Sequence, residues 1–308
     1  MNHKRVLVTV AVGGILSIVA GCSDLKTDLP SPVEPGIQVH PKTWIDTASA
    51  DFHGNIIKDA NWDMRSCQSC HGVLYNGGTS GVSCRTCHTD AAGPENCSTC
   101  HGSPTSVAPP RDLSGNTSRS ARGVGAHQIH LRGSSIAGTL LCAQCHTTPG
   151  SVYEPGHING TNRATVHFNE PLANMSTNKV GTIDYDPELP IYQPSPVYDQ
   201  TALNCANTYC HGYFKNGNLT NSPTWNDTTG ASSLCGSCHG DVTQPLNTVA
   251  RSVPKTTAQG GTHPNVVALG LTNCVVCHGD VVDENFRIIN TAKHINGKLD
   301  VLGRESDW

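Results

Sequence analysis

The sequence repeats one short arrangement of thiols and imidazoles, in which two cysteines separated by two residues are followed directly by a histidine. It occurs at Cys67-Cys70-His71, Cys84-Cys87-His88, Cys97-Cys100-His101, Cys142-Cys145-His146, Cys235-Cys238-His239 and Cys274-Cys277-His278. A further site, Cys205-Cys210-His211, has four residues between its cysteines. The two thiols of such a motif can add to the vinyl groups of a porphyrin, and the histidine then becomes the proximal iron ligand. The pattern therefore predicts seven covalently bound haem c groups.

Other uses of paired cysteines explain the pattern less well. A CxxC pair can be half of a zinc site or a thioredoxin-like redox pair. Neither explains why a histidine follows the second cysteine at every site. At the four-spaced site, the two extra residues must bulge while both thiols keep their reach to the porphyrin.

The N-terminus has the pattern of an export signal. Residues 1–21 begin with Lys4 and Arg5 and continue as an apolar stretch over 6–20, shorter than the roughly 20 residues of a membrane-spanning helix. The segment 18–22 resembles a bacterial lipobox, which implies cleavage before Cys22 and acylation of its thiol; Ser23 resembles outer-membrane sorting. The alternative is an ordinary signal peptide with a coincidental cysteine. Cys22 is the one cysteine outside the seven motifs, so no pair is left for a disulfide.

The composition predicts a chain with little aliphatic or aromatic core. Aromatic residues make up 5% of the chain, with 31 glycines and 19 prolines. We expect mostly irregular coil with short helices and a few short β-hairpins wrapped around a haem stack, and an apoprotein that does not fold. Removal of Lys4 and Arg5 with the signal peptide takes the formal charge from −4 to −6, which disfavours nucleic acid and anionic lipid as partners.

Proline-rich and Ser/Gly-rich segments divide the chain. The run 23–36 holds three prolines and suits a flexible tether, and the segments 114–125 and 187–196 separate groups of motifs. The predicted divisions are a signal peptide (1–21), a lipidated cysteine and tether (22–39), an N-terminal triple-haem block (40–113), a single-haem module (114–190) and a C-terminal triple-haem module (191–308).

Histidines outside the motifs are candidates for the distal iron ligands. The mature chain has eight, and seven haems need seven; we favour His53, His127 or His130, His157, His263 and His294, with His167 and His40 the weakest candidates. His157 and His294 each begin a His-Ile-Asn-Gly segment that precedes a strand-like stretch, which fits a turn beside a ligand or a plain hairpin with an exposed histidine. Met64 and Met175 are the only methionines after the signal peptide, so methionine-ligated haems can be few.

The order of motifs over 198–303 resembles the multihaem cytochromes of metal-reducing bacteria that carry a CxxxxCH motif followed by CxxCH motifs. The residues that carry the resemblance are Cys205–His211, Pro223-Thr-Trp225, Cys235–His239, His263-Pro264, Cys274–His278 and 294–301. The segment from Phe52 through the first three motifs looks like a related block. The resemblance implies extracytoplasmic electron transfer, often in anaerobic respiration of metals. Implied partners are other redox proteins of the periplasm or outer membrane and extracellular metal oxides or chelated metals, with a lipid anchor holding the chain to the membrane.

Histidine on both faces of a haem iron leaves no open coordination position, which predicts an electron carrier rather than an enzyme. One alternative is a multihaem reductase of nitrite, hydroxylamine or a sulfur oxyanion with one five-coordinate haem. Another is a filament-forming cytochrome. The motifs at 67–71, 84–88 and 97–101 are separated by only 12 and eight residues, so we expect their haems to lie close enough for fast electron transfer.

Overall fold

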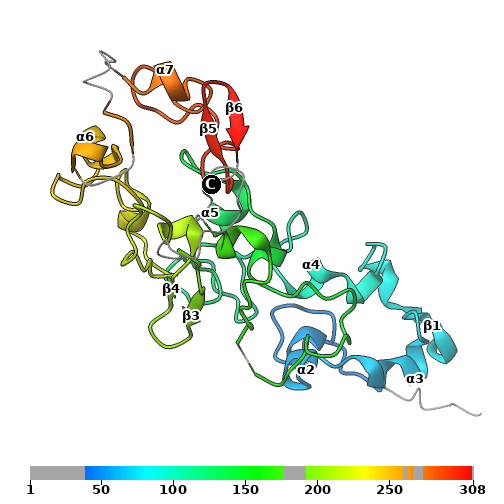
Figure 1. The fold of residues 1–308 in the computed structure, drawn as a ribbon. Coiled ribbons are helices and arrows are strands. Elements are labelled where there is room, and N and C mark those ends of the chain that lie inside the picture. Colours follow the sequence, from blue (N-terminus) through cyan, green and yellow to red (C-terminus); the bar gives the residue numbers. More distant parts are fainter. Residues whose placement is uncertain (1–38, 162, 177–191, 260–262, 266–272, 307–308) are drawn as a thin grey trace, which may run out of the picture. The chain divides into compact units, whose positions relative to one another are not determined.

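The computed structural model describes residues 39–161, 163–176, 192–259, 263–265 and 273–306 (Figure 1). The chain divides into two units, residues 1–60 and residues 61–308. The predicted signal peptide, Cys22, all of the tether except Val39, and the predicted boundary at 190/191 lie outside the described residues.

Helices in the described residues are short. The α-helices are α2 (His53–Asp59), α3 (Gln68–His71), α4 (Cys97–Cys100), α5 (His127–Arg132), α6 (Val249–Ser252) and α7 (Val275–His278). The 3₁₀ helices span Arg65–Cys67, Gly78–Ser80, Cys84–Thr86, Gly93–Glu95, Cys142–Gln144, Pro171–Asn174, Tyr209–His211, Ala231–Ser233 and Thr257–Gln259. Glycines soon interrupt several of them; Gly72 and Gly133, for instance, follow α3 and α5 with positive φ. No helix in the described part of the chain is long and apolar enough to cross a membrane.

Strands form antiparallel two-stranded hairpins. β1 (Asn76–Gly77) pairs with β2 (Val82–Ser83), β3 (Val197–Asp199) with β4 (Asn204–Ala206), and β5 (Leu299–Val301) with β6 (Arg304–Ser306). The β5–β6 pair turns at Leu302 and Gly303, both with positive φ, rather than at the Asn296-Gly297 step. The predicted mixture of coil, short helices and short hairpins is therefore confirmed.

The segment 164–168, expected to be strand-like, pairs with no other strand. Its backbone serves a haem motif instead. The N–H of His167 donates to the carbonyl of Cys145 at 2.8 Å, and the carbonyl of Thr165 accepts from the ring of His146. These bonds use the groups that a partner strand would need.

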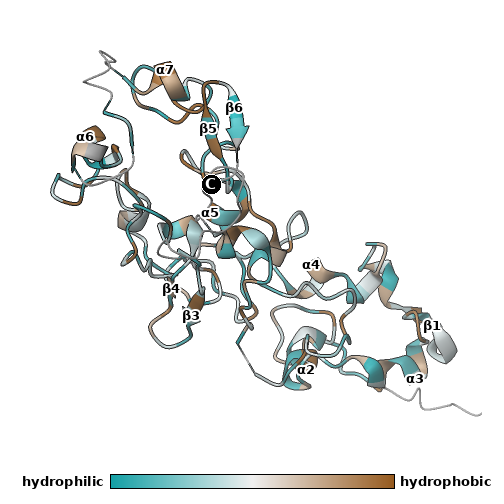
Figure 2. Cartoon of the chain, in the orientation of Figure 1, coloured by the Kyte–Doolittle hydropathy of each residue, from teal (hydrophilic) through white to brown (hydrophobic). Residues whose placement is uncertain are grey.

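Very few apolar side chains are buried by protein atoms. Among the described residues the buried ones are Met64, Tyr75, Val124, Ala173, Tyr209 and Val281. Several large apolar side chains next to the motifs are exposed, including Val73 at 74% and Leu141 at 73%. Figure 2 shows apolar residues interspersed with polar ones along the ribbon. The polypeptide therefore has no continuous hydrophobic core of its own in the described residues.

The described part of the first unit is organised around aromatic rings. His40 stacks on Trp44 with ring centres 4.3 Å apart, and Trp44 lies 6.1 Å from His53, which also contacts Phe52. Both the backbone N–H and Nδ1 of His53 lie 2.9 Å from the carbonyl of Trp44. The two candidate ligands of this unit are thus fixed by one tryptophan.

Candidate haem-binding sites

Most of the regular motifs fold as a single helical turn. Because positions i, i+3 and i+4 lie on one face of a helix, this turn presents both thiols and the imidazole to the same side. The turn is closed by a hydrogen bond from the histidine N–H to the carbonyl of the first cysteine, at 3.0 Å for His88, His101 and His146 and 2.8 Å for His278. The local fold thus provides the arrangement that covalent haem attachment requires.

The four-spaced site is built from two different elements. Cys205 lies in β4 opposite Tyr198, whereas Cys210 and His211 lie in a 3₁₀ helix. Between them Asn207 has φ 56°, a left-handed conformation that asparagine adopts more readily than most residues. The extra residues are therefore accommodated in a bulge centred on Asn207.

Five of the motif histidines face a second histidine. The ring centres are 6.0 Å apart for His101 and His157, 6.2 Å for His146 and His127, 6.1 Å for His211 and His130, 6.3 Å for His239 and His294, and 6.4 Å for His278 and His263. A metal bound between two imidazoles holds each nitrogen at about 2 Å, and each ring centre lies about 1 Å further out, which gives about 6 Å between ring centres. The five pairs have the separation that a shared iron requires.

Hydrogen bonds fix which ring nitrogen faces the partner. A carbonyl can only accept, so a ring whose Nδ1 bonds a carbonyl carries its proton there and keeps the Nε2 lone pair for a metal. Nδ1 donates to Val124 from His127 at 2.9 Å and to Ala126 from His130 at 3.0 Å. The other such bonds run from His71 to Val82, His146 to Thr165, His157 to Val152, His239 to Ser252, His263 to Pro264, His278 to Asp300 and His294 to Ile136.

Burial keeps several of these rings neutral, the form that binds a metal. Burial lowers the pKa of His211 to about 4, and the nearby His130 contributes to the decrease. Burial also lowers the pKa of His101, His127, His130, His239 and His294. These histidines therefore suit iron coordination better than proton exchange with solvent.

Thiols of neighbouring motifs lie near each other. Burial raises the pKa of Cys205 and of Cys210 to about 12, and Cys145 contributes to both shifts. The Nδ2 of Asn221 lies 3.7 Å from the sulfur of Cys238 and also donates to the carbonyl of His211 at 2.9 Å. None of the motif cysteines forms a disulfide. The attachment sites at 142–146, 205–211 and 235–239 thus adjoin one another.

The last motif is held by the backbone of a buried aspartate. Asp300 in β5 is 5% exposed, and its backbone carbonyl accepts from Nδ1 of His278 at 2.7 Å. Lys293 pairs with the carboxylates of both Asp280 and Asp300. Because Lys293 precedes His294, these ion pairs help to fix that histidine as well.

The remaining candidates differ in their surroundings. His167 is exposed, and its backbone rather than its ring supports the His146 site. His40 and His53 lie in the first unit beside Trp44. The sequence predicts His127 or His130 as a ligand, whereas in the structure each faces a different motif histidine. Their spacing of three residues, which places both on one helix face, was the available signal.

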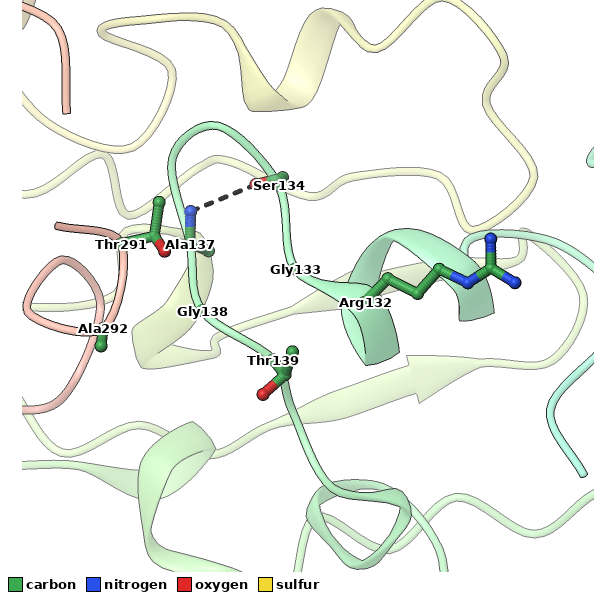
Figure 3. A pocket seen from close by; sticks show the side chains of 8 residues that line it. All are labelled: Arg132, Gly133, Ser134, Ala137, Gly138, Thr139, Thr291 and Ala292. Carbon is green, nitrogen blue, oxygen red and sulfur yellow. Dashed lines mark hydrogen bonds between the residues drawn. The ribbon is translucent and has the colours of Figure 1, made fainter. Parts of the chain in front are cut away.

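An open hollow of about 360 Å³ lies between the loop after α5 and residues 291–292 (Figure 3). Within that loop, the N–H of Ala137 donates to Ser134 Oγ at 3.1 Å. The loop also includes Ile136, whose carbonyl accepts from the ring of His294. The loop therefore supports a histidine that is far away in the sequence.

Comparison with known proteins agrees with the resemblance noted in the sequence. Residues 204–239 match the family described as the Geobacter CxxxxCH...CXXCH motif, which confirms the predicted resemblance over this segment. This motif indicates covalently bound haem c and a multihaem cytochrome of electron transfer. No curated protein and no solved structure is similar enough to this chain to match it.

Proposed function

We propose that this chain is a heptahaem c-type cytochrome that carries electrons across or outside the cell envelope in anaerobic, metal-linked respiration. One observation carries the proposal: five motif histidines each face another histidine, with ring centres 6.0–6.4 Å apart. When bound, haem iron supplies a one-electron couple, and the protein sets its ligands, spacing and exposure.

In this proposal the distal ligands are His157 for the His101 haem, His127 for the His146 haem, His130 for the His211 haem, His294 for the His239 haem and His263 for the His278 haem. The Nδ1–H bonds to carbonyls support these assignments, because they orient Nε2 and increase its basicity. His53 and His40 remain candidate distal ligands from the sequence, without assignment to a particular haem. The exposed His167 is the proposed surplus histidine.

The assignments put the haems in series along the chain. His157 follows the His146 motif yet faces His101, and α5 supplies ligands to both His146 and His211. Asn221 then joins the next two sites, since its Nδ2 donates to the carbonyl of His211 at 2.9 Å and lies 3.7 Å from the sulfur of Cys238. His294 belongs to the segment after His278 but faces His239. Electrons would therefore pass from motif to motif in sequence order, between external redox partners at the two ends.

Haem stoichiometry tests the proposal directly. The intact mass of the mature protein should exceed that of the lipidated polypeptide by seven haems, with no cysteine open to alkylation. A mass with six haems, together with alkylation of Cys205 and Cys210, would show that the four-spaced site is not used. The chain would then not be a heptahaem cytochrome.

We also propose that acylated Cys22 holds the protein at the outer membrane. The apolar stretch 6–20 followed by Cys22 supports this location. The Cys22→Ala variant should be haem-loaded and appear in the soluble fraction, whereas the native protein stays with the membranes. A variant that remains with the membranes after a salt wash would contradict lipid anchoring.

A further inference from the structure

Trp225 lies against both histidines of α5. Its ring centre is 4.7 Å from that of His127, with the two planes at 90°, and 5.8 Å from that of His130, with the planes at 17°. The indole therefore meets one ring edge-on and the other nearly parallel, both favourable aromatic geometries.

The indole is anchored on the loop that leads into α5. The indole Nε1 donates to the carbonyl of Arg122 at 2.8 Å, and the backbone N–H of Trp225 donates to the carbonyl of Leu203 at 2.5 Å. Gly125 leaves space for it, since a Cβ there would lie 2.0 Å from Nε1. Two further hydrogen bonds join the same two segments, from Asn226 to Ser120 and from Arg119 to Asp227, and Arg122 also donates to the carbonyl of Gln200 after β3. The ring is thus held in one place from both sides.

The two ligand pairs on α5 differ in ring orientation. The planes of His127 and His146 meet at 25°, whereas those of His130 and His211 meet at 79°. The pair His239–His294 is also close to perpendicular at 76°, and the pairs at His101 and His278 are at 31° and 28°. The haems of His146 and His211, which are adjacent in the series, would therefore have different axial-ligand geometry.

Ring orientation determines the electronic state of a low-spin ferric haem. Each imidazole plane raises one of the two iron dπ orbitals, so parallel rings separate these orbitals and perpendicular rings leave them nearly equal in energy. Nearly equal orbitals give an electron paramagnetic resonance signal with a large maximum g value, and separated orbitals give a rhombic signal. The groups that fix the ligand rings therefore tune each haem.

We infer that Trp225 is a positioning residue shared by two haems, which holds His130 perpendicular to His211 and His127 nearly parallel to His146. The inference rests on the proposed function, because it requires these histidines to be iron ligands. Trp225 is neither an attachment residue nor a proposed ligand. It can therefore be replaced while every cysteine and histidine of the two haem sites stays in place.

The test compares the ferric resonance spectra of the native protein, Trp225→Leu, Trp225→Phe and the control Phe286→Leu, each with its haems counted by mass. Phe286 is an exposed aromatic residue in the turn after Asp283. Trp225→Leu should lose large-g intensity equivalent to one haem, because His130 is no longer stacked. Trp225→Phe keeps a flat ring but loses the bond to Arg122, so its signal should shift with unchanged intensity. Phe286→Leu should match the native spectrum.

An unchanged spectrum in a fully loaded Trp225→Leu variant would overturn the role of Trp225, as would the same change in Phe286→Leu. If the Leu variant does not load its haems, an unshifted signal in the Phe variant overturns it. Absence of low-spin haem from the native protein would instead contradict the proposed function, so the two failures are distinguishable.

Discussion

At the scale of single residues, the carbonyl behind a histidine suits it for a metal as much as its own ring does. His127, His130 and His157 each bond a carbonyl within five residues. His294 depends on the distant Ile136. A short-range partner orients the ring within one segment, whereas a long-range partner also links two segments. Residue type alone does not reveal this difference.

Replacement of a distal histidine should convert one haem in seven to a high-spin form. In His130→Ala the haem at Cys205 and Cys210 keeps its thioethers and His211 but loses its sixth ligand, so it should bind carbon monoxide. Free imidazole should restore the low-spin spectrum. Optical titration with carbon monoxide measures the change, and His167→Ala is the matched control because His167 is exposed. Equal carbon monoxide binding in both variants would contradict the assignment of His130.

At the scale of elements, the spacing of cysteines is compatible with the helical turns that the structure shows at most regular motifs, because i, i+3 and i+4 share a face. Distal pairing could not be predicted in the same way. His157 lies close to His146 in the sequence but faces His101, because the partner is chosen by packing between distant segments rather than by local periodicity. The prediction of a strand at 164–168 was wrong for the same reason. The backbone of this segment forms hydrogen bonds with the His146 ring and with the Cys145 carbonyl instead of with another strand.

The bulge at Asn207 is the element that distinguishes the four-spaced motif. Asn207→Val should hinder haem attachment there, because a β-branched side chain disfavours the left-handed conformation by about 1–2 kcal/mol. Asn207→Gly should be tolerated, since glycine adopts positive φ freely. Intact mass should show a fraction of Asn207→Val molecules with six haems and full loading of Asn207→Gly. Complete loading of both variants would show that the bulge is not needed for attachment.

At the scale of the whole molecule, the composition correctly predicted a small apolar core: few described apolar side chains are buried, and large ones such as Val73 and Leu141 are exposed beside the motifs. Porphyrin faces would cover such side chains, and iron bonds would join segments that share few other contacts. We therefore expect chains that lack haem to give the rapid hydrogen exchange of an unfolded polypeptide.

A potentiometric titration of the intact protein, followed optically and by electron paramagnetic resonance, tests the central claim most directly. Coordination by two histidines should make every assigned haem low-spin and place most potentials below that of the standard hydrogen electrode. The account predicts broad, overlapping reduction of all seven haems by one external donor, with a spectrum unchanged by nitrite. A haem that titrates alone, remains high-spin and binds nitrite would contradict it and would identify a catalytic centre instead.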